Sequence, residues 1–97
     1  MRRHFASIIA ALVIIPAQAA DFDTAAYCRT VSEAVGGSYQ IELTCREQEA
    51  SARNRIQRTT IPDRVYTYCT RGAQAIGGSY QILESCIEQE LKAKGTM

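Results

Sequence analysis

Apolar residues recur every three or four positions in four consecutive stretches of this chain, and polar residues fill the intervals. This spacing gathers the apolar side chains on one face of an α-helix. The stretches run from about residue 23 to 35, 39 to 56, 63 to 76 and 80 to 94. No stretch shows the sustained alternation of apolar and polar residues that indicates a β-strand. The pattern therefore predicts an all-α protein with four short helices.

Residues at the ends of these stretches predict where the helices begin and end. Asp23 or Thr24 can cap the first helix and Ser38 the second, because short polar side chains accept hydrogen bonds from free backbone N–H groups. Thr60 is the predicted cap of the third helix, and Gly95 the predicted end of the fourth. The apolar face of the second helix is predicted to consist of Ile41, Cys45, Ala52 and Ile56. On its polar faces we expect the i,i+4 ion pairs Glu42/Arg46 and Glu49/Arg53.

The chain contains an internal duplication with a period of 41 residues. Aligning Tyr27–Glu49 with Tyr68–Glu90 gives 13 identical positions out of 23. The longest identical run is Gly-Gly-Ser-Tyr-Gln-Ile, which occupies residues 36–41 and again residues 77–82. Two units are too few for an extended solenoid, so we expect them to pack together. The predicted units span about residues 23–58 and 60–95.

In each unit a glycine pair lies midway between two cysteines. If the glycines form the turn of a helical hairpin, equal arms bring the two thiols opposite each other. Glycine suits such a turn because it adopts positive φ without steric cost. Among the three pairings that four cysteines allow, this symmetry favours one disulfide within each hairpin. The predicted bridges are Cys28–Cys45 around Gly36-Gly37 and Cys69–Cys86 around Gly77-Gly78.

The first residues have the pattern of an export signal. Arg2 and Arg3 precede an apolar run from Ala6 to Ile15, and Ala17-Gln18-Ala19 matches the small-x-small motif that signal peptidase accepts. The run is shorter than the roughly 20 residues that span a bilayer, so we expect no retained transmembrane anchor. We predict a signal peptide at residues 1–19 and a single small domain at residues 20–97. Disulfides in so short a chain are typical of a periplasmic or secreted protein.

Composition argues against most catalytic and nucleic-acid-binding functions. Without Arg2 and Arg3 the chain has 9 basic and 10 acidic residues, a net charge of −1, which offers no electrostatic attraction for nucleic acid. The only histidine, His4, lies in the predicted signal, so the predicted mature domain lacks the commonest general base. The cysteines have neither zinc-site nor Cys-x-x-Cys redox spacing. We therefore predict no catalytic residues, no metal and no cofactor.

The remaining candidates are surfaces that could bind a partner. Tyrosine provides a large contact area at low entropic cost, and one follows each glycine pair. The sequence favours a simpler alternative, in which Tyr39 packs on Leu43 and Tyr80 on Leu83 across their own turns. Arginines near the joint between the units could bind an acidic partner, although such arginines are more commonly just solvated. The candidate partner-binding residues are Tyr39, Gln40, Tyr80, Gln81, Arg53, Arg55 and Arg58.

These observations favour a small exported protein without catalytic activity. The function we expect is that of a protein-binding module of the bacterial envelope, acting as an inhibitor, an adaptor or a secreted factor. One alternative is a carrier that holds a small apolar ligand in a groove between the hairpins. Another is a purely structural protein of envelope stress. The sequence leaves open the identity of the envelope or extracellular partner and the oligomeric state.

Overall fold

The computed structural model describes residues 20–97, so the predicted signal peptide lies outside the described residues. Four α-helices follow one another in this part of the chain, and residues 20–97 contain no strand. The predicted all-α class is confirmed. The helices are α2 (Thr24–Ala34), α3 (Tyr39–Gln57), α4 (Asp63–Ala75) and α5 (Tyr80–Thr96).

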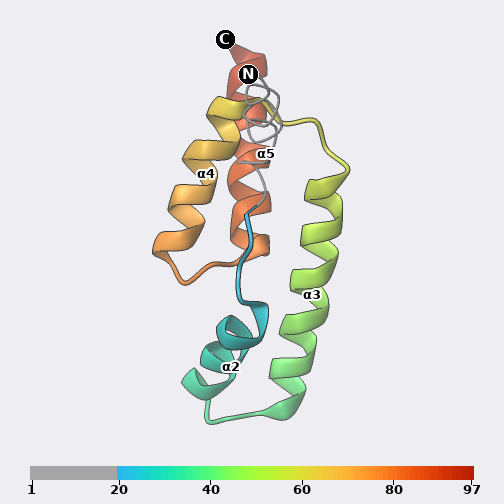
Figure 1. The fold of residues 1–97 in the computed structure, drawn as a ribbon, viewed down its shortest axis with the longest axis vertical. Coiled ribbons are helices and arrows are strands. Elements are labelled where there is room, and N and C mark those ends of the chain that lie inside the picture. Colours follow the sequence, from blue (N-terminus) through green and yellow to red (C-terminus); the bar gives the residue numbers. More distant parts are fainter. Residues whose placement is uncertain (1–19) are drawn as a thin grey trace, which may run out of the picture.

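Helix α3 connects the two duplicated units in space. It packs against α2 on one part of its length and against α5 on another, and α5 also packs against α4 (Figure 1). We call α2 and α3, with the segment that precedes them, unit 1, and α4 with α5 unit 2. The direct helix–helix contact between the units is therefore that of α3 with α5.

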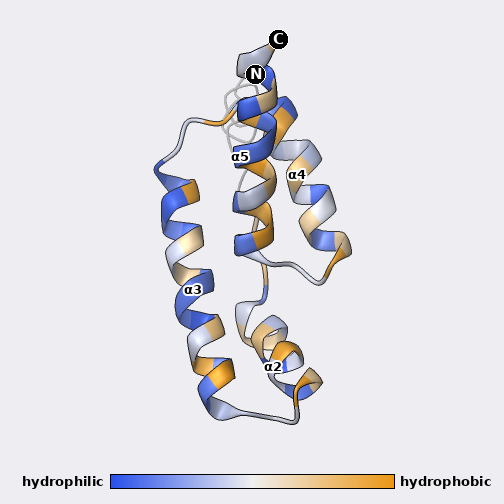
Figure 2. Cartoon of the chain, turned by 180° about the vertical axis from the view of Figure 1, so that it is seen from behind, coloured by the Kyte–Doolittle hydropathy of each residue, from blue (hydrophilic) through white to orange (hydrophobic). Residues whose placement is uncertain are grey.

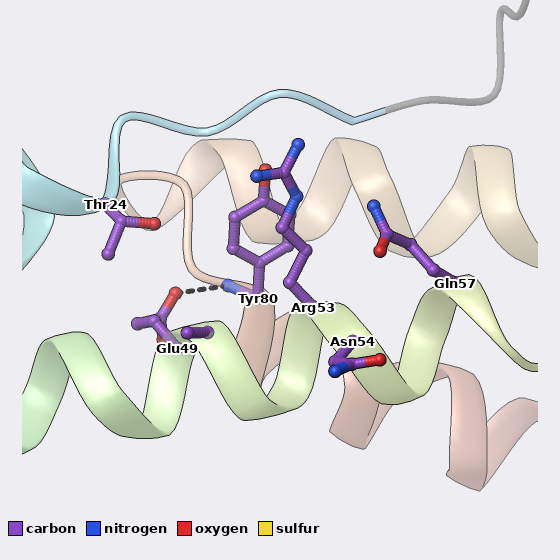
Figure 3. Close-up of a pocket in the computed structure, with 7 residues that line it drawn as sticks. Thr24, Glu49, Arg53, Asn54, Gln57 and Tyr80 are labelled. Atoms are coloured by element: carbon purple, nitrogen blue, oxygen red, sulfur yellow. Dashed lines mark hydrogen bonds between the residues drawn. The ribbon is translucent and has the colours of Figure 1, made fainter.

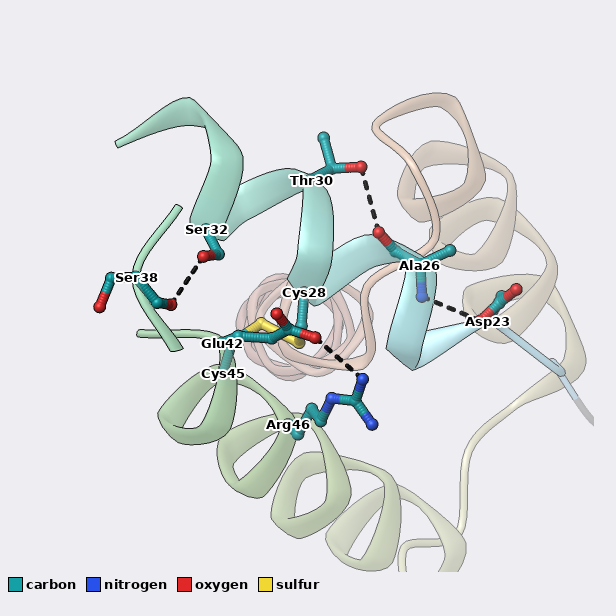
Figure 4. Close-up of polar contacts among 9 residues, drawn as sticks. All are labelled: Asp23, Ala26, Cys28, Thr30, Ser32, Ser38, Glu42, Cys45 and Arg46. Atoms are coloured by element: carbon teal, nitrogen blue, oxygen red, sulfur yellow. Dashed lines mark hydrogen bonds and ion pairs between the residues drawn. A yellow bond between two sulfur atoms is a disulfide. The ribbon is translucent and has the colours of Figure 1, made fainter. Parts of the chain in front are cut away.

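Each unit contains one disulfide, and the pairing is the predicted one. Cys28 is bonded to Cys45 and Cys69 to Cys86, with the two Cα atoms 5.6 Å apart in both bridges. The first bridge joins α2 to α3 (Figure 4) and the second joins α4 to α5. In the chain-entropy description, a bridge closing a loop of this length stabilises the fold by about 3 kcal/mol.

The predicted caps are confirmed in unit 1 and wrong in unit 2. Asp23 Oδ1 accepts from Ala26 N at 3.0 Å (Figure 4), and Ser38 Oγ accepts from Ile41 N at 3.2 Å. The predicted cap Thr60 is not the N-cap of α4. Pro62 occupies that position, and it makes no side-chain cap bond. Proline serves there because its fixed φ suits the start of a helix.

The predicted end of the last helix is also wrong, by one residue. Helix α5 continues through Gly95 to Thr96. Gly95 is not among the glycines with positive φ, so it does not form a left-handed stop. The four glycines with positive φ are Gly36, Gly37, Gly77 and Gly78, with values of 100°, 88°, 107° and 82°.

The buried core lies mostly in unit 2 and in the part of α3 that faces it. Its largest fully buried apolar side chain is that of Leu83, and α3 contributes Ala52 and Ile56. The predicted apolar face of α3 is wrong at Ile41, which is 40% exposed. The reason is that α5 packs against only one part of α3, which leaves the apolar residues Val35, Ile41 and Leu43 near the turn of unit 1 exposed. Figure 2 shows hydrophobic segments next to this turn.

Candidate protein-interaction site

The two copies of the six-residue repeat occupy different environments. We call Gly36–Ile41 tip 1 and Gly77–Ile82 tip 2. Tyr80 of tip 2 is 3% exposed, whereas the equivalent Tyr39 of tip 1 is 89% exposed. Identical local sequences therefore form one buried contact and one open surface.

Tip 2 is held by a buried carboxyl group from unit 1. Glu49 of α3 has no exposed surface, and its Oε1 accepts from the backbone N–H of Tyr80 at 2.6 Å (Figure 3). Its Oε2 accepts from Ser79 Oγ at 2.7 Å, from Gln81 N at 3.3 Å and from Gln81 Nε2 at 3.1 Å. The first backbone N–H groups of a helix have no partner within that helix, and the helix dipole favours negative charge there. Glu49 thus caps α5 from the other unit.

Sequence reasoning missed this role of Glu49. The i,i+4 pair Glu42/Arg46 is present at 2.9 Å, but the carboxyl group of Glu49 points into the interface between the units and not toward Arg53. The pattern of charges along α3 does not distinguish a solvated glutamate from one that caps a distant helix. The one sign in the sequence that set Glu49 apart from other surface acids was its identity with Glu90 across the repeat.

The ring of Tyr80 fits between α3 and the segment that precedes α2, both of which belong to unit 1. The ring centroids of Phe22 and Tyr80 are 4.9 Å apart at an interplanar angle of 48°. The guanidinium carbon of Arg53 lies 5.3 Å from the Tyr80 centroid, and Figure 3 shows this side chain beside the ring. The hydroxyl of Tyr80 accepts from Phe22 N at 3.0 Å and donates to Ala20 O at 3.2 Å. Tyr80 therefore packs against unit 1 and is not available to an external partner.

The surface around tip 1 carries the unused counterparts of these groups. Among residues 20–97, no acceptor bonds the backbone N–H groups of Tyr39 and Gln40. Val35 and Leu43 near the tip are more than half exposed. An apolar surface next to free helix N–H groups is suited to contact another protein, since tyrosine combines apolar area with hydrogen bonding.

The three candidate arginines differ in their contacts. Arg53 packs over Tyr80, and Arg55 forms an ion pair with Glu84 of α5, with Nε–Oε2 at 2.7 Å and Nη2–Oε1 at 2.9 Å. The hydrogen bond to Glu84 raises the pKa of Arg55 above its usual value. Arg58 is exposed at the end of α3. Two of the three arginines thus contact unit 2 of the same chain.

A groove lies at the far end of unit 2, between α4 and the C-terminal part of α5. Its volume is about 920 Å³. Both apolar and charged side chains line it. Among them are Val65, Tyr68, Glu90, Ala93, Lys94 and Met97.

The described residues offer no metal site, because no three His, Cys, Asp or Glu side chains within them are grouped closely enough to hold an ion. None of the helices described is both long enough and apolar enough to cross a membrane. Comparison with protein-family models, with curated proteins and with solved structures finds no significant match.

Proposed function

We propose that this chain is an exported, non-catalytic protein-binding module of the bacterial envelope, built from two disulfide-linked helical hairpins. Its binding surface is tip 1 together with the exposed apolar residues beside it. The observation that carries the proposal is the exposure of Tyr39, 89%, in a sequence whose second copy is buried in a contact between units.

Tip 2 illustrates what this six-residue sequence can bind. Its contacts to unit 1 combine an aromatic ring, a capped helix N-terminus and close approach of a glycine backbone. These are features of protein–protein interfaces, in which rigid aromatic anchors bury large areas at little entropic cost. The disulfide between Cys28 and Cys45 holds the two helices that flank tip 1, so little ordering is required on binding.

Export is supported by the two disulfides and by the signal pattern at residues 1–19. Disulfides persist in the periplasm and outside the cell, and are rare in a reducing cytosol. A disulfide in each unit of a chain this short is consistent with folding after export.

The apolar-ligand carrier has weaker support. Tyr80, Leu83 and Glu49 fill the buried space between the units. The hollow of about 440 Å³ beside them is lined largely by polar side chains, among them Arg53, Asn54 and Gln57 (Figure 3). The groove of about 920 Å³ lies within unit 2, and its lining includes Arg64, Arg71 and Glu90. The alternative requires a groove between the hairpins, and this groove lies between two helices of the same hairpin.

The proposal can be tested by placing a photo-crosslinking amino acid at position 39 in cells that export the protein. We expect a covalent adduct with a protein, identified by mass spectrometry and reproduced with the purified partner. The matched control carries the same crosslinker at position 88, on the exposed surface of α5. Absence of a protein adduct at position 39, or an equal yield of the same adduct at position 88, would refute the proposal.

A further inference from the structure

We infer that the partner of tip 1 is a second copy of this chain, which binds tip 1 in the groove of its unit 2. The inference rests on the proposed function, because it names the partner of the same surface. The contact of tip 2 with unit 1 provides the template. Tip 1 and the groove of unit 2 correspond to the two sides of that contact, and both are open.

Five residues of α2 and α3 lie around tip 2, and Phe22 of the preceding segment also packs on it. Tyr27 lies beside Gly77, where an added Cβ would be 3.6 Å from its ring, and Glu49 caps the first turn of α5. Arg53 covers the Tyr80 ring, while Ala52 and Ile56 belong to the same buried cluster as Tyr80. The five residues are Tyr27, Glu49, Ala52, Arg53 and Ile56.

Moving each of these residues along the chain by the 41-residue period gives Tyr68, Glu90, Ala93, Lys94 and Met97. All five line the groove of unit 2. Three of the positions are identical, Lys94 keeps the positive charge of Arg53, and Met97 keeps the apolar character of Ile56. The groove is therefore a second copy of the surface that receives tip 2, and within the described chain no tip occupies it.

Exposure supports this correspondence. Tyr27 is partly covered in unit 1, whereas Tyr68 is 61% exposed. Ile56 is buried, whereas Met97 is fully exposed. The groove residues thus have the apolar area that their counterparts bury against tip 2, and tip 1 has the same sequence as tip 2.

The polar groups of the two open surfaces also match. Tip 1 offers the backbone N–H groups of Tyr39 and Gln40, and the groove offers the carboxyl group of Glu90. In a head-to-tail contact Glu90 would accept these N–H groups as Glu49 accepts those of Tyr80 and Gln81. Lys94 would face the Tyr39 ring as Arg53 faces that of Tyr80, a favourable cation–π arrangement.

Three substitutions make the contact between copies weaker than the one inside the chain. Asp63 stands where Phe22 packs on Tyr80, and Glu42 and Leu43 stand where unit 2 has Leu83 and Glu84. Less apolar area is therefore buried, so we expect reversible association. Because the two surfaces differ and lie at opposite ends of the molecule (Figure 1), the contact is heterologous and can add further copies.

The experiment is sedimentation of the purified oxidised protein over a concentration series up to the millimolar range. We expect the weight-average mass to rise with concentration. Tyr39→Ala removes the aromatic ring of tip 1, and Glu90→Lys replaces the acceptor for its N–H groups by a positive charge. In each variant alone, the association constant should fall by at least about ten-fold. An equimolar mixture of the two variants should form a heterodimer and nothing larger, since one keeps an intact groove and the other an intact tip.

Ile76→Ala and Glu88→Lys are matched controls at exposed positions outside both surfaces and should associate like the unmodified protein. Circular dichroism checks that each variant is folded. If Glu90→Lys is unfolded, Glu90→Gln takes its place in the experiment. A monomer at every concentration would overturn the inference, as would association lost in Tyr39→Ala but unchanged in both Glu90 variants, which indicates a tip-to-tip dimer. If the purified chain stays monomeric while the crosslinker at position 39 still captures a different protein, the proposed function stands and this inference fails.

Discussion

The carboxyl group of Glu49 in α3 accepts the backbone N–H of Tyr80, the first residue of α5, at 2.6 Å. The two residues are 31 positions apart in the chain and belong to different units. A helix N-terminus is usually capped by a residue immediately before it, and Ser79 does cap α5 locally through Ile82 N. Glu49 adds a second cap that also joins the units.

The role of Glu49 can be measured by comparing it with its repeat counterpart. Glu49→Ala leaves the buried donors of Ser79 and Tyr80 and the partly buried ones of Gln81 without this acceptor, which costs about 1–3 kcal/mol. We expect Glu90→Ala to change the free energy of unfolding by less than about 0.5 kcal/mol, as at an ordinary surface site. Urea denaturation at a dilution that keeps the chain monomeric provides the measurement, and equal losses in the two variants would contradict the assigned role of Glu49.

The two tyrosines of the repeat should differ in their effect on stability. Tyr80→Ala removes a ring that is 3% exposed and packs on Phe22, so we expect a loss of about 3–5 kcal/mol in the free energy of unfolding. Tyr39→Ala removes a ring that is 89% exposed, so the change should stay below about 0.5 kcal/mol. Thermal unfolding followed by circular dichroism gives both values. A large loss for Tyr39→Ala in the monomer would show that the ring packs within its own chain.

The second glycines of the two turns form another matched pair. Gly37 has φ of 88° and Gly78 has φ of 82°, so alanine is strained in both to about the same extent, roughly 1–2 kcal/mol. A Cβ at Gly78 would also lie 3.2 Å from Phe22 Cδ1, whereas a Cβ at Gly37 would meet nothing within 4 Å. Gly78→Ala should therefore destabilise more than Gly37→Ala. Adding Phe22→Ala to both variants tests the cause, because the difference between the two glycine variants should then shrink.

Each disulfide should contribute a similar amount to stability, because both close loops with a sequence separation of 17 residues. Replacing Cys28 and Cys45 together by serine should lower the free energy of unfolding by about 3 kcal/mol, and the same applies to Cys69 and Cys86. Peptide mapping without reductant should recover only crosslinks within a unit. A crosslink between the units in the exported protein would contradict the observed pairing.

Loss of either disulfide should affect the order of tip 1 to a different extent. The Cys28–Cys45 bridge holds the two helices that flank tip 1, whereas the Cys69–Cys86 bridge lies in unit 2. Loss of the first bridge should therefore raise hydrogen exchange at tip 1 more than loss of the second. Equal exchange at tip 1 in both variants would show that the bridge does not order this surface.

The helices, their approximate limits and the disulfide pairing could be predicted from the sequence. These features depend on short-range spacing: the helical period of the apolar residues, positive φ at the glycine pairs, and equal numbers of residues between each turn and its cysteines. The boundaries at Thr60 and Gly95 were wrong by one to three residues, because Pro62 begins α4 without a side-chain cap and Gly95 stays helical.

The environments of the two identical tips were decided by the tertiary structure alone. Residues 36–41 and 77–82 have the same local preferences, so no local signal separates the exposed Tyr39 from the buried Tyr80. The difference arises because α3 of unit 1 extends alongside α5 and places Glu49 and Arg53 against tip 2, while no equivalent helix in the described chain covers tip 1. Sequence thus determined the two units and their disulfides, and packing between the units determined which tip remained available for binding.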